Sequence, residues 1–168
     1  MATLEILTYP DDILKQKALP VETVDDAIRT LVDDMAETMY SAPGVGLAAN
    51  QVGVLKRVAT IDVTYTDGTP NLIVLINPEI VSKDGNCLSE EGCLSLPGIT
   101  EEVERAERVT VRALNRNGEP FELTAEGFLA SAVQHELDHL EGVVLLDKLS
   151  FLKKRMLTRE LVKRKQGR

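Results

Sequence analysis

The chain has no tryptophan, and aromatic residues make up only 4% of its 168 residues. Its core must therefore consist mainly of Leu, Val, Ile and Ala, because hydrophobic residues still amount to 43% of the sequence. This length and composition suffice for one buried core, and no repeat, low-complexity segment or linker divides the sequence. We expect a single domain over residues 1–168.

No run of apolar residues approaches the roughly 18 that a membrane-spanning helix requires. The first residues lack the basic segment followed by an apolar one that marks a secretory signal. The two cysteines, Cys87 and Cys93, cannot supply the disulfide framework of a secreted domain, although one bridge between them is geometrically possible. We expect no membrane contact and a location in a bacterial-type cytosol, with an organelle as the alternative.

Histidine is also scarce, since the chain contains only His135 and His139, with Glu136 directly after the first. On a helix this spacing places both imidazoles on one face, where they can share a metal ion, with Glu136 offset by about 100°. The glutamate can then reach a water molecule on that metal. A pair of surface histidines without a metal is the alternative.

A catalytic zinc-type site usually takes three protein ligands, so the chain must supply one more. Metzincin proteases would use the position of Leu145, which cannot bind a metal. Thermolysin-like enzymes use a later glutamate, which points to Glu160, a lone acid in a basic tail. Cys93 is the strongest candidate because thiolates bind such metals well, although a cysteine is as often a small buried apolar side chain.

The net charge of −8 conceals an uneven distribution. Residues 151–168 contain one acid and eight bases, which are Lys153, Lys154, Arg155, Arg159, Lys163, Arg164, Lys165 and Arg168. This tail is either a solvated terminal helix or an arm that binds an anionic surface such as RNA. Its apolar pairs recur every five residues, which is longer than the helical period of about 3.6. The helix over 151–168 is therefore predicted from the helix propensity of its residues.

The first half of the chain predicts one helix followed by two strands. Thr23 has the character of an N-cap, and apolar residues then recur at helical spacing until Pro43 and Gly44. Two runs rich in Val and Ile, 57–63 and 72–77, flank a segment of turn residues. They predict a pair of strands joined by a turn.

The second half predicts a hairpin followed by the helix that carries the histidines. Residues 103–114 and 121–124 flank an Asn-Arg-Asn-Gly segment typical of a hairpin turn. The helix is expected from about residue 125 to 140, with one apolar face. The fold class is therefore α+β, with antiparallel or mixed sheets around a central HExxH helix and further helices at both ends.

Arg105 is expected to point inward. If residues 103–113 form a regular strand, its side chain shares a face with Val103 and other apolar residues and needs an anionic partner. Glu91 is the natural candidate. A bulge that turns Arg105 to solvent is the alternative.

Three short segments lie in order along the chain: Gly44-Val45-Gly46-Leu47-Ala48-Ala49-Asn50-Gln51, Glu91-Gly92-Cys93-Leu94-Ser95 and Gln134-His135-Glu136-Leu137-Asp138-His139. Together they resemble the three signature motifs of the peptide deformylase family. The resemblance covers nearly the whole chain, including residues 6–11 at the start and 147–150 after the metal helix. Three motifs in the right order are far more specific than any one of them.

The resemblance implies hydrolytic removal of the formyl group from the N-terminal formyl-methionine of new polypeptides, with release of formate. It assigns Cys93, His135 and His139 as metal ligands. It assigns Glu136 as the group that takes a proton from the attacking water and later passes it to the leaving nitrogen.

The resemblance also assigns Gln51 and the backbone N–H of Leu94 as hydrogen-bond donors to the developing oxyanion. In relatives the peptide docks in extended form beside the first motif. We therefore expect Val45, Gly46 and Gly92 to approach the substrate backbone. Without the family, Gln51 would be taken for an exposed loop residue and the glycines of the first motif for turn residues.

A thiolate with two imidazoles accommodates iron(II), zinc, cobalt or nickel. The resemblance implies ferrous iron in the working enzyme, with the other ions as alternative occupants. It also implies nascent formyl-methionyl peptides as substrates. Because relatives act on chains that emerge from the ribosome, our hypothesis is that the basic tail docks on ribosomal RNA. We expect a monomer.

The chain departs from some bacterial relatives at Pro43, where they have an acid, and at Thr100, where they have an arginine. Substrate preference beyond the first residue is therefore open. Two other functions remain open from the sequence. A metallopeptidase would use a different third ligand, and a binding module with a structural metal would need a fourth, such as Asp138 or Glu141.

Overall fold

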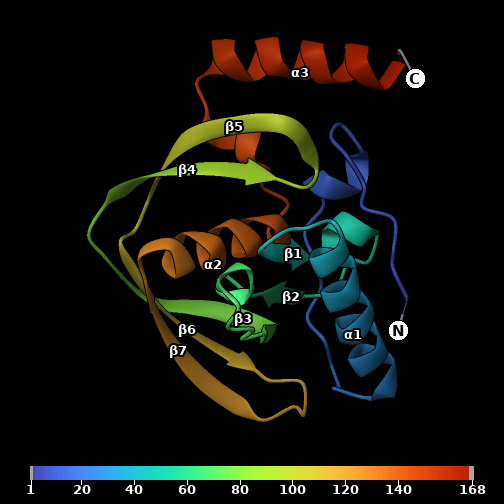
Figure 1. Cartoon of the computed structure of the whole chain (residues 1–168), viewed down its shortest axis with the longest axis vertical. Helices are drawn as coiled ribbons and strands as arrows, with labels where there is room; N and C mark the ends of the chain where they lie inside the picture. The colour runs from blue at the N-terminus through green and yellow to red at the C-terminus, as the bar shows by residue number, and fades with distance from the viewer. Residues whose placement is uncertain (1, 167–168) are drawn as a thin grey trace.

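One helix lies between a five-stranded sheet and a separate β-hairpin in the computed structural model, which describes residues 2–166 (Figure 1). The sheet is antiparallel, with the order β1 (Gly46–Ala48), β2 (Val58–Ile61), β3 (Ile73–Asp84), β6 (Arg108–Leu114) and β7 (Pro120–Glu126). The hairpin consists of β4 (Cys87–Cys93) and β5 (Leu96–Arg105). The expected α+β class is confirmed, and so is the pairing of the strands in the 57–63 and 72–77 runs.

Within residues 2–166, three α-helices accompany the strands: α1 (Asp26–Ser41), α2 (Gly127–Leu140) and α3 (Phe151–Gln166). The same part of the chain forms four short 3₁₀ helices, η1 (Asp12–Lys15), η2 (Ala49–Val52), η3 (Tyr65–Asp67) and η4 (Leu145–Lys148). The prediction of Thr23 as the cap of the first helix is wrong. Asp25 is the N-cap instead, because its carboxylate accepts the Ile28 N–H at 3.0 Å and satisfies a free donor of the first turn.

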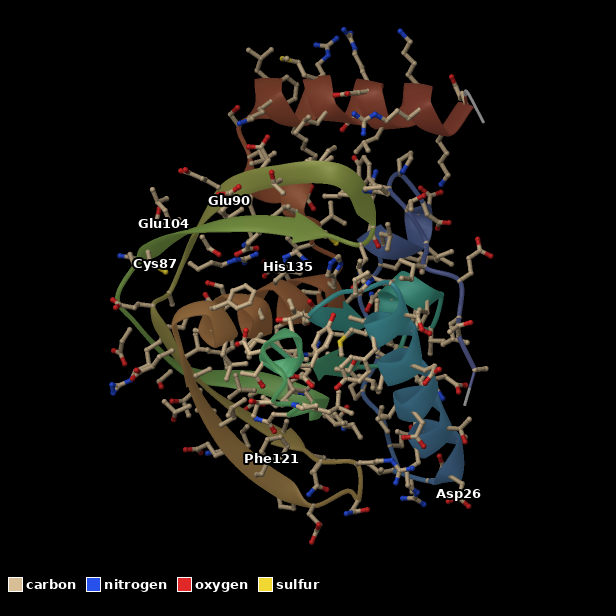
Figure 2. The ribbon with its side chains drawn as sticks, viewed as in Figure 1. Asp26, Cys87, Glu90, Glu104, Phe121 and His135 are labelled. Carbon is tan, nitrogen blue, oxygen red and sulfur yellow. The ribbon has the colours of Figure 1, made fainter. Side chains whose placement is uncertain are left out.

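Helix α2 is buried on almost every side, which a single apolar stripe did not predict. Its apolar residues Ala130, Val133 and Leu137 pack on the sheet. Its polar face, which includes His135, is also buried because the β4–β5 hairpin covers it. Figure 2 shows His135 in the space between α2 and this hairpin. The histidine pair therefore lies inside the protein.

The chain leaves the sheet after β3, forms the hairpin on the other side of α2, and returns to form β6 (Figure 1). The prediction of one strand over 103–114 is therefore wrong, because Ala106 and Glu107 separate β5 from β6. The Gln134 side chain binds both backbone groups of Ala106, each at 2.9 Å, so these groups need no strand partner. The predicted hairpin partner, β7, does pair with β6.

Helix α3 confirms the prediction of a terminal helix over 151–166, and residues 167–168 lie outside the described residues. It packs through Leu157 and Leu161 against a cluster that includes Tyr9 and Ile99. Within residues 2–166, no helix combines the length and the hydropathy needed to cross a membrane. Cys87 and Cys93 are both free thiols.

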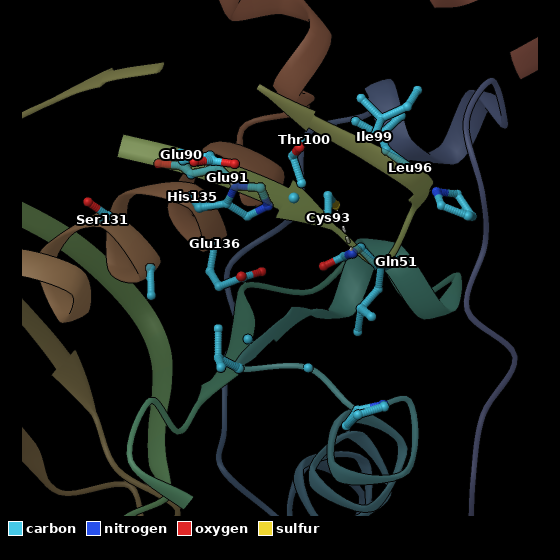
Figure 3. A pocket seen from close by; sticks show the side chains of 18 of the residues that line it. Gln51, Glu90, Glu91, Cys93, Leu96, Ile99, Thr100, Ser131, His135 and Glu136 are labelled. Carbon is cyan, nitrogen blue, oxygen red and sulfur yellow. Dashed lines mark hydrogen bonds and ion pairs between the residues drawn. The ribbon is translucent and has the colours of Figure 1, made fainter. Parts of the chain in front are cut away.

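A cavity of about 690 Å³ opens between the hairpin, α2, η2 and the loop before β1 (Figure 3). His135, Glu136, Cys93 and Gln51 all line it, and apolar side chains make up much of the remaining wall. The fold thus brings all three sequence motifs to one cavity.

Candidate metal centre

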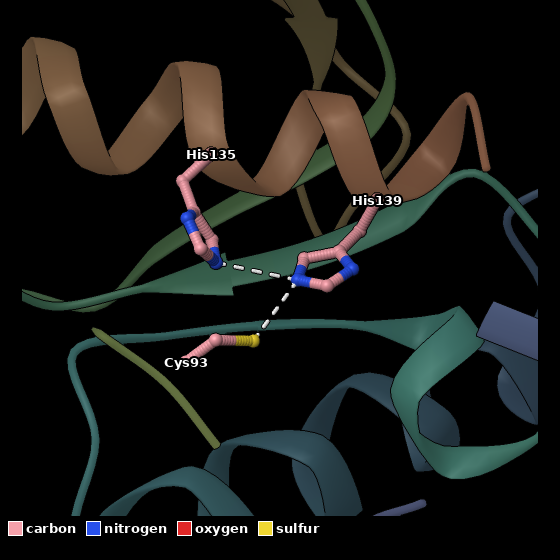
Figure 4. A group of neighbouring side chains, drawn as sticks. All are labelled: Cys93, His135 and His139. Atoms are coloured by element: carbon pink, nitrogen blue, oxygen red, sulfur yellow. Dashed lines mark hydrogen bonds between the residues drawn. The ribbon is translucent and has the colours of Figure 1, made fainter. Parts of the chain in front are cut away.

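The three predicted metal ligands converge, with Cys93 at the end of β4 and both histidines on α2 (Figure 4). Cys93 Sγ lies 3.3 Å from His139 Nε2, which lies 3.3 Å from His135 Nε2. All three ligand atoms lie within 4.8 Å of one another. Cys93 therefore lies where the predicted third ligand of the histidine pair must be.

The group fits a divalent metal ion. Bonds of about 2.0–2.3 Å in tetrahedral geometry place neighbouring donor atoms about 3.3–3.8 Å apart. The separations of His139 Nε2 from Cys93 Sγ and from His135 Nε2, 3.3 Å each, agree with this range. Burial and the charge of His135 hold the pKa of His139 well below its usual range, which keeps this ring neutral as a ligand must be. The donor set suits iron(II), zinc, cobalt or nickel.

The other ligands considered from the sequence are engaged elsewhere. Leu145 is buried in the apolar core, and Glu160 pairs with Arg164 on α3. Asp138 binds Arg105 at 2.6 Å, and Glu141 binds Arg57. These contacts leave the group with three candidate ligands among the described residues, the number that a catalytic site usually takes.

Glu91 and Arg105 form the ion pair predicted from the sequence, and both side chains are buried. Arg105 Nε and Nη2 bind the two Glu91 oxygens at 2.9 and 2.7 Å, a bidentate arrangement. The same carboxylate accepts a hydrogen bond from His135 Nδ1 at 3.0 Å, which leaves His135 Nε2 for the metal. Glu91 therefore orients a predicted ligand, and Arg105 holds Glu91.

These contacts also set the charge of both groups. Burial alone would raise the pKa of Glu91, but hydrogen bonds from Arg105 and His135 lower it to about 2. Burial would lower the pKa of His135, but contacts with Cys93 and Glu91 raise it well above its usual range. A metal ion therefore competes with a proton at this imidazole.

We expect Arg105→Leu to reduce the free energy of unfolding by about 3–5 kcal/mol, because Glu91 then stays buried and charged without its partner. Urea unfolding of the metal-free protein measures this loss. The double variant with Glu91→Gln should recover part of it, since the amide needs no counterion. Arg112→Leu is the matched control, because Arg112 is exposed and its pair with Glu122 is loose, at 3.6 Å. An equal loss in both single variants would contradict the assignment.

Glu136 points into the cavity from the helical turn that carries His135 (Figure 3). Only 4% of the residue is exposed, and its Oε1 has no hydrogen-bond partner within residues 2–166. Burial raises the pKa of its carboxyl to about 7, the range in which one group can both accept and return a proton. The free oxygen is therefore available to a water molecule or a substrate.

Gly46 fits closely against this carboxylate, and a methyl group added at Gly46 would overlap it. We expect Gly46→Ala to displace Glu136 and to lower kcat by about 10²-fold, because catalysis is sensitive to such displacements. Steady-state hydrolysis of a formylated peptide measures the change. Gly68→Ala is the control, since this exposed turn glycine, with φ 80°, has no atom near the added methyl group. It should lose stability and keep activity.

Gln51 is buried, and the structure contradicts its interpretation as an exposed loop residue. Its Oε1 accepts the Ala48 N–H at 2.9 Å, and its Nε2 donates to Ser95 Oγ at 3.1 Å and approaches Cys93 Sγ at 3.5 Å. The amide is thus fixed with its donor end beside the predicted ligands. Ser95 ends the second motif, but the sequence analysis gave it no role, because only the fold brings its hydroxyl to the Gln51 amide.

Val45, Gly46, Gly92 and Leu94 line the cavity, as expected for residues that meet a substrate. The Val45 carbonyl accepts the Asp62 N–H at 2.8 Å, which ties the loop before β1 to the end of β2. Pro43 and Thr100, where the chain departs from some relatives, also line the cavity, together with the half-exposed Phe128.

Comparison with known proteins places the chain in a family. A model of the family Polypeptide deformylase matches residues 3–155. The chain is 51% identical to a peptide deformylase of Thermodesulfovibrio yellowstonii, over 98% of this chain and 100% of that one. It is 55% identical to a peptide deformylase of Neisseria gonorrhoeae, over 99% and 98% of the two chains.

Comparison with solved structures gives the same family. A peptide deformylase from Legionella pneumophila is 50% identical and superposes with a TM-score of 0.91, covering 99% of both chains. A peptide deformylase from Ehrlichia chaffeensis in complex with actinonin is 41% identical, with a TM-score of 0.93 and 98% of both chains covered. The chain belongs to the polypeptide deformylase family and is a metal-dependent hydrolase that removes N-terminal formyl groups.

Proposed function

We propose that this chain deformylates the N-terminal formyl-methionine of new polypeptides with Cys93, His135 and His139 as the ligands of one divalent metal ion. The observation that carries this proposal is the convergence of these three ligand atoms beside the free carboxylate of Glu136, in one cavity. A bound ion would act as a Lewis acid toward water and the formyl carbonyl.

Glu136 moves the protons in this scheme. Its carboxylate accepts a proton as water adds to the formyl carbon, and it delivers that proton to the amide nitrogen as the carbon–nitrogen bond breaks. The products are formate and a free amino group. Because an amide nitrogen leaves poorly without a proton, both transfers are needed. Burial raises the pKa of the Glu136 carboxyl to about 7, which suits both transfers.

Gln51 Nε2 and the Leu94 N–H are the proposed donors to the oxyanion that forms at the formyl carbon. The amide of Gln51 is already held by Ala48 and Ser95, so it need not reorganise as charge develops. Val45, Gly46 and Gly92 are proposed to bind the substrate backbone in extended form, and the apolar wall of the cavity to accept the methionine side chain.

Ferrous iron is the proposed working ion, with zinc, nickel or cobalt as other occupants. Formate release from a formyl-methionyl peptide by the anaerobic iron form, beside the Glu136→Ala variant, tests the whole proposal. Activity in the iron form and its absence in the variant support it. Equal release by both proteins would refute the role of Glu136.

We also propose that α3 docks on ribosomal RNA while the chain acts as a monomer in the cytosol. Arg155, Arg159 and Lys163 lie four residues apart along one side of α3 and form no ion pair with the described residues. Other bases of the helix are engaged, since Lys153 pairs with Glu101 and Lys154 with Asp147. The three free bases are therefore the proposed phosphate contacts.

Reversing these three charges to glutamate should weaken ribosome binding and lower the slope of log affinity against log salt by about 2–3, because each phosphate contact contributes close to one unit. Co-sedimentation with ribosomes at several salt concentrations measures this slope. Activity on a short formylated peptide should not change. Lys83→Glu on β3 serves as the control. Unchanged ribosome binding in moderate salt would refute the docking proposal.

A further inference from the structure

Two buried polar atoms, one on a predicted metal ligand and one on the residue before Gln51, have no hydrogen-bond partner within residues 2–166, and the mechanism uses neither of them. They are Asn50 Oδ1 and His139 Nδ1. Asn50 is completely buried, and His139 is 1% exposed. Because buried polar groups in native proteins are nearly always paired, two such atoms need an explanation.

The two atoms are chemically complementary. His139 Nε2 faces Cys93 and His135. When this nitrogen binds a metal ion, the proton of the neutral ring resides on Nδ1, which is then a donor. Asn50 Nδ2 donates to the Gln16 carbonyl at 2.8 Å, which fixes the amide and leaves Oδ1 as the free acceptor. One atom therefore offers the hydrogen bond that the other lacks.

The elements that carry the two residues are in contact. Asn50 lies in η2, which packs against α2. Residues 16–18 run beside both elements and form hydrogen bonds with each of them. Gln16 accepts the hydrogen bond from Asn50, and Ala18 N donates to the Leu140 carbonyl, next to His139, at 2.9 Å. Ala18 also packs with Ala48 and Leu140 in one apolar cluster. In Figure 4 the second ring nitrogen of His139 points away from Cys93 and His135.

We propose that Asn50 is a positioning residue for the metal centre. One buried water molecule accepts the His139 Nδ1–H and donates to Asn50 Oδ1. Metal-binding histidines commonly donate their other N–H to a carboxylate, carbonyl or water, which fixes the ring. Glu91 performs this role for His135, and Asn50 performs it for His139. Buried waters occupy sites of this kind, between polar atoms that lack other partners. The inference rests on His139 being a metal ligand.

The test compares Asn50→Leu with Asn77→Gly in zinc affinity, measured on the apo protein by competition with a chelator. Asn77 is the control because, like Asn50, it binds the backbone of the N-terminal segment, through two hydrogen bonds with Val21. Its φ of 52° suits glycine. Asn50→Leu should bind zinc about 10–100-fold more weakly, as expected when the partner of a ligating histidine is lost. Asn77→Gly should stay within about twofold of the native affinity.

Native zinc affinity in Asn50→Leu would overturn the inference. His139→Ala separates this result from a failure of the proposed function, since native affinity in that variant would remove His139 from the ligand set altogether. If Asn50→Leu does not fold, nitrogen-15 NMR of the unaltered zinc form decides. A His139 Nδ1–H protected from exchange and close to a water molecule is expected, and a rapidly exchanging proton would refute the bridge.

Discussion

Glu136→Gln should lower kcat for a formyl-methionyl peptide by about 10²–10⁴-fold, the usual contribution of a general acid and base. Glutamine has the same shape, so the variant should fold and fill the same space against Gly46. Its amide cannot accept a proton from water or return one to the leaving nitrogen. Since the loss falls on the transition state, KM should stay within about twofold.

Formate release under saturating substrate measures this effect, and metal content must be determined in parallel. Zinc affinity should remain native, because Glu136 is not in the ligand group. Glu104→Gln is the matched control, an exposed carboxylate on β5 that forms no ion pair among the described residues (Figure 2). It should keep native activity. A Glu136→Gln variant with native kcat would remove the residue from the reaction.

The convergence of Cys93, His135 and His139, the place of Glu136 in the same cavity, and the pairing of Arg105 with Glu91 were predictable from the sequence, from local spacing, from motifs and from strand alternation. The helical spacing of His135 and His139 fixes one face of α2, and Cys93 is the strongest remaining candidate for a soft third ligand. Strand alternation placed Arg105 inward even though the strand itself ends there.

Features that depend on contacts between distant elements were not predictable. The run 103–114 is continuous in β propensity, yet Gln134, on α2, binds the backbone at Ala106 and divides it between two sheets. Asp138 is a second partner of Arg105, and only the approach of the hairpin to α2 brings them together. The burial of the polar face of α2 has the same origin, because the covering hairpin comes from another part of the chain.

Cys93→Ala should abolish tight metal binding and, with it, activity. Apparent free energies for four-ligand zinc sites are about 10–16 kcal/mol, so one ligand accounts for roughly 3–4 kcal/mol. This corresponds to an affinity lower by about 10²–10³-fold. Chelator competition with zinc measures the affinity, and loss of thiolate-to-metal absorption in the cobalt form identifies the missing ligand.

Cys87→Ala is the matched control, because the two cysteines begin and end the same strand, and only Cys93 belongs to the ligand group. The same chemical change at Cys87 should therefore leave metal affinity, the cobalt spectrum and formate release intact. If Cys93→Ala bound metal with native affinity, the third ligand would have to come from elsewhere, and the peptidase alternative would return. Loss in both variants would instead indicate that the strand as a whole, not the thiolate, holds the site together.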